Sequence, residues 1–493
     1  MRPLPDGFAG LSFEERAAFF AADDESARKR PNPNGGDNEE APETEFGKRA
    51  KAKKAAFPSV TEDAAALEFA RLYRGKLLFD HDAGAWFEWT GCHWKREGTG
   101  LALEWARQLA RKLSDGQPPS IRKTAFTSGV EKFARGDRTF AVTSEHWDRD
   151  PFLLGTPDGT VDLRTGVLRG ADPTDKISRL TSVSPAGTVN CPLWLAFLDE
   201  ATGNDHALIR FLQQFFGYSL TASTQEHALL FIHGAGNNGK SVLLNTVSWI
   251  MGDYAKTAAM DAFVQTKGEK HSTDVAMLHG ARLVAASEIA KGRAWNENLI
   301  KSLTGGDPIT ARFMRRDNFT FQPTFKLTVV GNHKPRLQSV NEAARRRFNI
   351  VPFDRMPANP DPQLEQKLRA EGPGVLRWLI DGCLDWQEVN GLGRPQSVLT
   401  ATEEYFADQD LFSQWLEDEC DAEPGNRWKC EKSGDMFAAW AAYAKRAGED
   451  PGSKVAFADE LTEREFVQDR GSGGVRLYRG IRLKLQKGTS SDE

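Results

Sequence analysis

The sequence predicts an α/β fold: a central parallel-sheet domain with a phosphate-binding loop, a mixed α+β domain before it and a small domain after it. Three observations predict this fold. An apolar strand at residues 228–232 runs into GAGNNGKS and then into a helix with apolar periodicity, the setting that a phosphate loop requires. Strand-like and helical segments alternate over residues 221–355, as in parallel sheets. Helical patterns followed by a hairpin pattern close the sequence.

The composition is that of a soluble, folded protein. The chain has 493 residues, of which 40% are hydrophobic and 27% are charged, and this length allows two to four domains of about 150 residues. It has no run of about 20 apolar residues and no signal-peptide pattern, so we expect a cytoplasmic protein without a membrane partner. Its five scattered cysteines form no C-x-x-C pair, which favours a reducing compartment and disfavours a zinc site.

We expect four segments along the chain. Residues 1–59 are rich in charge and poor in aliphatic side chains, which predicts disorder, and their basic cluster GKRAKAKK fits a solvated linker better than a DNA contact. Residues 60–190 predict the mixed α+β domain, where the tryptophans of WFEWTGCHW are expected in a hairpin and its core rather than against bases. Residues 191–395 predict the phosphate-loop domain with a helical lead-in, and residues 396–493 predict the small C-terminal domain.

The phosphate loop carries the most specific chemistry. Glycines let the backbone curl so that its N–H groups surround phosphates, and the following helix adds partial positive charge. Lys240 is expected to reach the β- and γ-phosphates of ATP and Ser241 to bind Mg²⁺. The expected nucleotide-binding residues are Gly234, Ala235, Gly236, Asn237, Asn238, Gly239, Lys240, Ser241 and Val242.

Two later strands end in polar residues that suit the same reaction. ARLVAASE ends at Glu288, where an acid can hold the metal or polarise the attacking water; Glu297 follows nearby and could share this task. FKLTVVGN ends at Asn332, whose amide could contact the γ-phosphate or orient water. A strand ending in an acid by chance and a simple turn asparagine are the alternatives.

Arginines stand out in two further segments. Arg345, Arg346 and Arg347 precede an apolar strand, and an arginine supplied by a neighbouring subunit can raise phosphoryl-transfer rates by roughly 10³–10⁵. Between the acid and the asparagine, ITARFM and FTFQP predict a hairpin with Arg315 and Arg316 at its tip. Such a tip suits a nucleic-acid backbone. A solvated surface run is the alternative at both places.

This ordered set of motifs resembles superfamily 3 helicases. It is most similar to the motor half of phage and plasmid primase–helicases, relatives of the poxvirus primase–helicase. The resemblance covers about residues 60–484, including WFEWTGCHW, LLGTPDGTVDLRTG and VRLYRGIRLK outside the motor. The matching motor segments are GAGNNGKS (234–241), GARLVAASE (280–288), IKSLTGGDPITARF (300–313), PTFKLTVVGNHKPRL (323–337) and AARRRFNIVPF (343–353).

The resemblance implies an AAA+-like motor, a helicase-associated domain before it and a winged-helix-like domain after it. It also implies a homo-hexameric ring on DNA, ATP between subunits, 3′ to 5′ movement and, for a phage or plasmid protein, the host cytoplasm. A separate primase or polymerase would be a partner. By position, Glu288 matches the Walker B acid, Asn332 the sensor, and Arg346 and Arg347 the arginine pair that contains the trans finger. The segment placed against DNA contains Lys301, Arg312, Arg315 and Arg316.

The sequence departs from the family in two places and leaves two functions open. Arg345 stands where the family often has an aromatic residue, which blurs the identity of the finger. The family often carries an N-terminal primase domain, but Asp80 and Asp82 of FDHD lack supporting acids, so we do not expect priming. A DNA helicase is the first hypothesis. The second is an ATP-gated DNA-binding module that assembles on an origin or recruits partners without processive unwinding, which the basic tail with Arg476 and Arg482 favours.

Overall fold

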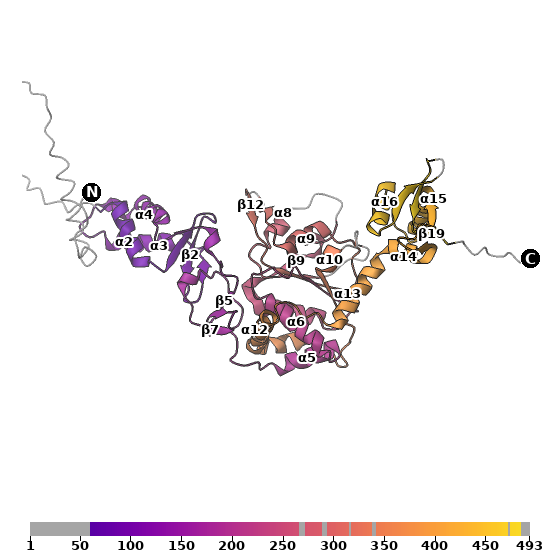
Figure 1. Ribbon diagram of the computed structural model, residues 1–493. Helices are drawn as coiled ribbons and strands as arrows, with labels where there is room; N and C mark the ends of the chain where they lie inside the picture. Colours follow the sequence, from indigo (N-terminus) through magenta and orange to yellow (C-terminus); the bar gives the residue numbers. More distant parts are fainter. Residues whose placement is uncertain are drawn as a thin grey trace, which may run out of the picture. The chain divides into compact units, whose positions relative to one another are not determined.

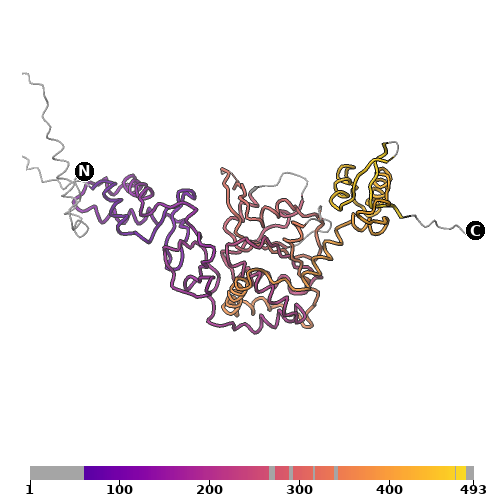
Figure 2. The backbone as a smooth tube through the Cα atoms, in the orientation of Figure 1, coloured from indigo at the N-terminus to yellow at the C-terminus, as the bar shows by residue number. Residues whose placement is uncertain are grey.

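The computed structural model divides the chain into two compact units, Met1–Trp147 and Asp148–Glu493. Figure 1 labels the elements and Figure 2 traces the backbone of the described residues. The segment expected to be disordered, residues 1–59, lies outside these described residues. The structure describes residues 60–265, 272–287, 293–314, 317–337, 342–471 and 474–484.

The first unit packs three helices against a mixed sheet. Strand β1 pairs antiparallel with β2 and parallel with β4. The predicted hairpin is confirmed, because β2 pairs antiparallel with β3. Trp86 and Trp94 are buried, so these two rings serve the core. The elements are α2 (Glu62–Tyr73), β1 (Leu77–Asp80), β2 (Ala85–Trp89), β3 (Trp94–Arg96), α3 (Leu101–Lys112), α4 (Thr124–Gly136) and β4 (Ala141–Val142).

The second unit begins at Asp148, inside the segment 60–190 that the sequence predicts as one domain. The break lies at residue 147, whereas residues 60–190 were expected to form one domain. Strands β5 (Leu153–Thr156), β6 (Gly159–Asp162) and β7 (Val167–Arg169) form a small antiparallel sheet. Its apolar residues Leu154 and Val161 belong to the same core cluster as the motor helices. Burial of this face against the motor, which a hairpin pattern does not reveal, moves the boundary.

The motor contains a five-stranded parallel sheet in the order β14-β8-β13-β10-β9. This confirms the predicted parallel α/β domain. Along β8, Leu230 and Ile232 enter one core cluster while Leu229 and Phe231 enter another, because alternate side chains point to opposite faces. The strands are β8 (Leu229–His233), β9 (Ala255–Ala259), β10 (Leu283–Ser287), β13 (Lys326–Gly331) and β14 (Phe348–Pro352).

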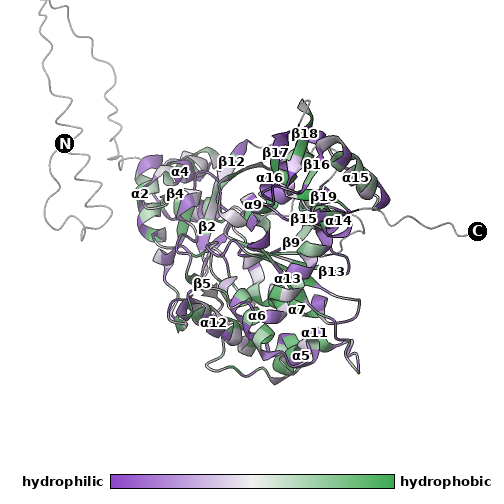
Figure 3. Ribbon diagram, turned by 45° about the vertical axis from the view of Figure 1, so that its right-hand side comes forward, coloured by the Kyte–Doolittle hydropathy of each residue, from purple (hydrophilic) through white to green (hydrophobic). Residues whose placement is uncertain are grey.

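Helices cover both faces of this sheet. One face holds α5, α6, α7 and α12, whose apolar residues share a cluster, and the other holds α9 and the end of α13. Figure 3 shows apolar residues, in green, interleaved with polar ones along α5 and α6. The helices are α5 (Pro192–Thr202), α6 (His206–Tyr218), α7 (Lys240–Met251), α9 (Glu297–Gly305), α11 (Leu364–Ala370), α12 (Gly372–Glu388) and α13 (Gln396–Gln409).

The C-terminal part of the second unit has a core of its own, which includes Trp415 and Tyr478. The predicted terminal hairpin is confirmed, because β17 pairs antiparallel with β18. Its winged-helix identity stays a prediction. Among the helices that the structure describes, none is both long and apolar enough to span a bilayer. The elements are α14 (Leu411–Glu419), β15 (Cys420–Ala422), β16 (Cys430–Lys432), α15 (Ser433–Arg446), α16 (Lys454–Glu463), β17 (Val467–Arg470), β18 (Arg476–Arg479) and β19 (Ile481–Leu483).

Candidate functional site

The glycine-rich loop joins the carboxyl end of β8 to the first residue of α7, as its motif predicts. Asn237 and Gly239 have positive φ angles of 59° and 85°, a region in which Asn and Gly are favoured. A Cβ on Gly234 would lie 2.0 Å from the backbone oxygen of Phe353. The loop therefore needs glycine at two places, once for backbone freedom and once for close approach.

Lys240 lies folded into this loop. Its Nζ donates to the backbone oxygens of Gly234 (2.9 Å) and Ala235 (2.6 Å) and to Oδ1 of Asn238 (2.7 Å). Desolvation lowers the pKa of Lys240, and the charge of Asp354 acts in the opposite direction. All three acceptors are neutral oxygens, so phosphate oxygens can replace them at an electrostatic gain.

The amide of Asn238 organises the loop from inside. The side chain is buried, and its Nδ2 donates to the backbone oxygen of Phe353 while its Oδ1 accepts from Lys240. We had expected Asn238 to contact nucleotide through the loop, and its side chain instead joins the loop to the end of β14. Asp354, one residue beyond Phe353, was missed as a neighbour of Lys240; an acid directly after a strand's carboxyl end was the available signal.

Asn332 lies beside the loop. Strands β13 and β8 pair in parallel with Gly331 opposite His233, so the next residues on both chains leave the sheet at the same edge. Asn332 is exposed there. Desolvation and then the charges of Lys334 and Lys240 lower the pKa of His233. The register thus brings the asparagine and the loop together.

The strand that precedes the predicted acid in the sequence is β10, which ends at Ser287. β10 pairs with β13, with Ser287 opposite Val330, so the chain after Ser287 leaves from the same edge as Asn332. Glu288 itself lies outside the described residues. Val242 and Ser241 stand in the first turn of α7, where Ser241 is exposed and Val242 is half-buried.

The arginine pair lies at the opposite end of the strands from the phosphate loop. Arg346 and Arg347 precede β14, whose first residue, Phe348, lies opposite Leu229, the first residue of β8. The loop follows the last residue of β8. At about 3.3 Å per residue, one strand length, roughly 15 Å, separates the arginine backbone from the loop of the same chain.

The three neighbouring arginines differ in their contacts. The guanidinium of Arg345 lies 5.1 Å from the centre of the Phe406 ring. Arg347 donates from Nη1 to the backbone oxygen of Ala343 at 2.6 Å, and its pKa is lowered by desolvation and by the charge of Arg346. Arg346 is exposed and makes one long bond of 3.4 Å, to the backbone oxygen of Glu342. Of the three, Arg346 is held most weakly by its own chain.

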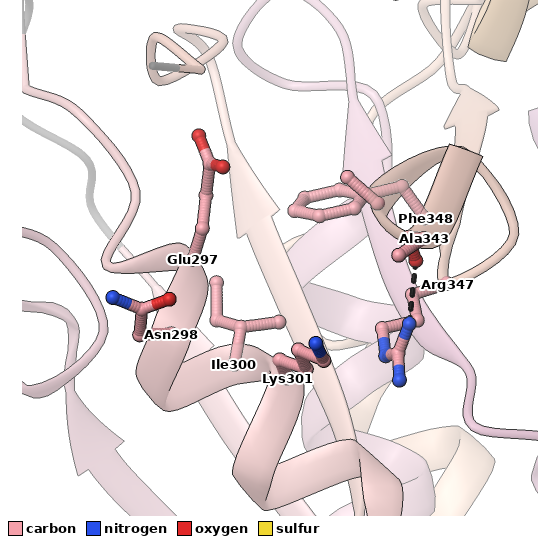
Figure 4. Close-up of a pocket in the computed structure, with 8 residues that line it drawn as sticks. Glu297, Asn298, Ile300, Lys301, Ala343, Arg347 and Phe348 are labelled. Atoms are coloured by element: carbon pink, nitrogen blue, oxygen red, sulfur yellow. Dashed lines mark hydrogen bonds between the residues drawn. The ribbon is translucent and has the colours of Figure 1, made fainter. Parts of the chain in front are cut away.

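Lys301 and Glu297 line a cavity of about 110 Å³ together with Arg347. Figure 4 shows Lys301 and Arg347 at one end of this cavity and Glu297 pointing to the other. The cavity lies on the α9 side of the sheet, whereas α7 covers the opposite face. Lys301, which we expected against DNA, is thus exposed beside the arginine pair.

The predicted hairpin between the acid and the asparagine is confirmed. Strand β11 (Ile309–Arg312) pairs antiparallel with β12 (Asn318–Phe321), with exposed Arg312 opposite Asn318. Phe313 stacks on Phe319 with ring centres 5.4 Å apart. The sequence pattern does not predict this stack, although it contains the phenylalanines of both strands. The tip arginines, Arg315 and Arg316, lie outside the described residues.

The acidic pair of FDHD has a structural environment. Asp80 is buried, and its carboxylate accepts from the backbone of Asp82 (2.9 Å), from Ser144 Oγ (2.8 Å) and from Trp147 Nε1 (2.8 Å). These donors join the end of β1 to the chain that follows β4. The carboxylate of Asp80 therefore stabilises the turn after β1.

The chain is similar to two families and to several viral proteins. Residues 66–203 match the family described as D5 N terminal like, and residues 232–347 match a family described as being of unknown function, DUF5906. A protein of Acanthamoeba polyphaga mimivirus named as a helicase is 24% identical over 329 residues, covering 60% of this chain and 33% of that protein. A helicase-named protein of Frog virus 3 (isolate Goorha) is 25% identical over 260 residues, covering 48% and 26%.

A helicase-named protein of Sputnik virophage is 28% identical over 189 residues, covering 33% of this chain and 24% of that protein. The chain thus spans a third or less of the length of these relatives. Among solved structures, the apo C-terminal region of NrS-1 is 10% identical with a TM-score of 0.49, covering 85% of this chain and 99% of that one.

Proposed function

We propose that this chain, a D5-like primase–helicase by its family matches and its helicase-named relatives, is an ATP-driven DNA helicase of superfamily 3. In this proposal its subunits form a ring, with six members by family resemblance, and hydrolyse ATP at their interfaces while moving on DNA. A separate primase or polymerase would supply the other steps of replication.

The observation that carries this proposal is the separation of the phosphate loop from the arginine pair. One strand length, roughly 15 Å, separates the backbones of the two groups, because β8 and β14 are parallel and in register. An arginine side chain that lies where the parallel strands begin cannot reach a phosphate held where the strands of the same sheet end. A neighbouring subunit that places the beginning of its strands against the phosphate loop would complete the site. Arg346 suits this role, because its side chain is exposed and makes only a long hydrogen bond within its own chain, among the described residues.

The residues of the loop fit a nucleotide with Mg²⁺. The backbone N–H groups at the N-terminus of α7 would donate to phosphate oxygens, as they do at other helix N-termini. Lys240 would exchange its three loop oxygens for phosphate oxygens, and exposed Ser241 would hold the metal. Bound Mg²⁺ supplies charge neutralisation on the phosphates. Glu288 would polarise the attacking water and Asn332 would orient it.

DNA would contact exposed cations of the β11–β12 hairpin and of α9. Arg312 on the β11–β12 hairpin and Lys301 on α9 are exposed, and Arg315 and Arg316 stand between β11 and β12 in the sequence. Contacts of this kind give affinity for the backbone without reading sequence.

The second candidate is an ATP-gated DNA-binding module without processive unwinding. The observation that favours it is the C-terminal hairpin, on which Arg470 and Arg476 lie opposite each other and both are exposed. Arg479 differs, because it is paired with Asp469 at 2.5 Å. Among the residues that the structure describes, neither of the guanidinium groups of Arg470 and Arg476 has an ion-pair partner, and two such groups side by side repel each other unless an anion lies between them.

The test is ATP-dependent unwinding of a forked DNA duplex by the full chain. Lys240→Ala and Arg346→Ala should each abolish unwinding. Mixing the two variants should restore part of the ATPase activity, because an interface that combines Lys240 of one variant with Arg346 of the other keeps both groups. Arg369→Ala is the matched control, since Arg369 is a surface arginine of the same unit paired with Glu365. DNA-stimulated ATP hydrolysis without strand separation would contradict the helicase and support the binding module.

A further inference from the structure

The first unit contains a cavity that the proposed motor does not use. Its volume is about 780 Å³, and it lies between β2, the end of β3, the start of α3 and one side of α4. Small residues such as Gly98, Gly100 and Ser128 contribute to its lining. Three cations, Arg96, Lys132 and Arg135, complete the wall.

The two carboxylates of this cavity are already engaged by the fold. Glu131 is 6% exposed and accepts from Trp86 Nε1 at 2.6 Å and from Arg135 Nε at 2.7 Å. Glu97 accepts from the backbone N–H groups of Gly100 and Leu101, both at 3.0 Å, and so closes the N-terminus of α3. Their negative charge is therefore compensated within the wall.

The cations are not compensated to the same degree. Arg135 alone has a carboxylate, and that buried carboxylate fixes its orientation; the guanidinium carbon also lies 5.2 Å from the centre of the Phe79 ring. Within the part of the chain that the structure describes, Arg96 and Lys132 are exposed and have no ion-pair partner. A fixed arginine that shares a cavity wall with two further cations is suited to bind multiply charged oxyanions.

The size of the cavity indicates how large the anion is. A volume of about 780 Å³ is within the usual range of roughly 300–1,000 Å³ for small-molecule and cofactor sites, and it exceeds what a lone phosphate fills. Leu103 contributes an apolar wall and is 41% exposed. An apolar surface beside three cations suits a sugar or base carried by phosphate.

We propose that this cavity is a second nucleotide-phosphate site, which holds phosphate on Arg96, Lys132 and Arg135 and rests the sugar or base against Leu103. The phosphate could belong to a single-stranded nucleic acid or to a free nucleoside triphosphate, and the test separates these two sources. The site lies in the first unit and uses none of the residues assigned to ATP hydrolysis. A failure of this proposal would therefore leave the proposed helicase function unaffected.

The test is the acetylation rate of individual lysines in the full chain, measured by mass spectrometry with and without a ligand. Lys132 should be protected several-fold by an oligothymidylate, by a deoxynucleoside triphosphate, or by both. Lys95 is the internal control, because it is exposed and adjacent to Arg96 but points to the other face of β3. Protection by the oligonucleotide alone identifies a strand as the ligand, and protection by the triphosphate alone identifies a free nucleotide.

Arg96→Ala should weaken the protection of Lys132 about tenfold, the effect of losing one charge-assisted contact. Arg107→Ala is the matched control, since Arg107 is an exposed arginine of α3 paired with Glu104 and outside the cavity. Unchanged acetylation of Lys132 with both probes overturns the proposal, and so does equal protection of Lys95 and Lys132. Glu131→Gln tests positioning: it should weaken binding while the amide oxygen still accepts from Trp86.

Discussion

Replacing Gly239 by alanine should disable the phosphate loop, whereas the same change at Gly236 should not. Gly239 has a φ angle of 85°, and a Cβ there would lie 2.7 Å from Cε2 of Phe197. The Phe197 ring is 6% exposed and belongs to the core, so it has little room to move. Gly236 provides the control, because a Cβ at that position would meet nothing within 4 Å and its φ is not positive.

The magnitude follows from two contributions. Holding alanine in the left-handed region costs about 1–2 kcal/mol, and overpacking a core contact costs about 1–3 kcal/mol. The two costs add to at least about 2 kcal/mol. If the loop must take up this free energy to reach its nucleotide-binding conformation, nucleotide affinity falls roughly 30-fold.

The assay is the anisotropy of a fluorescent ATP analogue titrated with each variant, with chemical denaturation in parallel. We expect Gly239→Ala to lose affinity, stability or both by that amount and Gly236→Ala to stay within twofold of the unsubstituted chain. Equal affinities and equal denaturation midpoints for the two variants would refute the reasoning, since the predicted strain would then be absent.

Three further predictions concern stability. Arg282→Met should destabilise the second unit by about 2–4 kcal/mol, because the buried backbone oxygen of Leu220 and the partly buried one of Leu153 lose a charged donor. Urea denaturation, with Arg369→Met at an exposed arginine as the control, measures the change. His279 is exposed in part, but desolvation of its ring and then the positive charges of Arg179 and Lys256 lower its pKa from the usual value. Its neutral form therefore contributes a small stability above about pH 6.5 that is lost as the pH falls. His279→Gln should slightly flatten the fall in melting temperature between about pH 7.5 and 5.5, and an unchanged fall would contradict this. Trp86→Phe removes the indole donor of buried Glu131 and should cost about 1–3 kcal/mol, and a change under about 0.5 kcal/mol in denaturation would argue against that bond.

The parts of the sheet that were predictable have strong patterns. β8, β10, β13 and β14 are mainly apolar, typical of strands buried on both faces, although β13 contains Lys326 and Thr328 and β14 contains Asn349. β9 was not predicted, because its sequence AKTAA contains small residues with weak strand preference. It lies at the sheet edge, where pairing with β10 alone defines it.

The loop could be located from sequence because its motif fixes local geometry, but the strand order could not. That Asn332 lies beside the loop and the arginines lie a strand length away follows from register alone. Sequence also could not choose between Arg346 and Arg347. Their difference arises from a contact to Ala343 and from exposure, and neither is encoded in the order of three identical letters.

The small sheet β5–β6–β7 has a consequence for how the motor can be cut or recombined. Tyr254 accepts a hydrogen bond from the Gly155 N–H and donates one to the backbone oxygen of Arg179, and Arg282 donates to the backbone oxygen of Leu153. A shortened chain that starts at residue 191 would strand both buried side chains without these partners, whereas one that starts at residue 148 keeps every one of these bonds. A stable shortened motor is therefore expected to include residues 148–190 together with the parallel sheet.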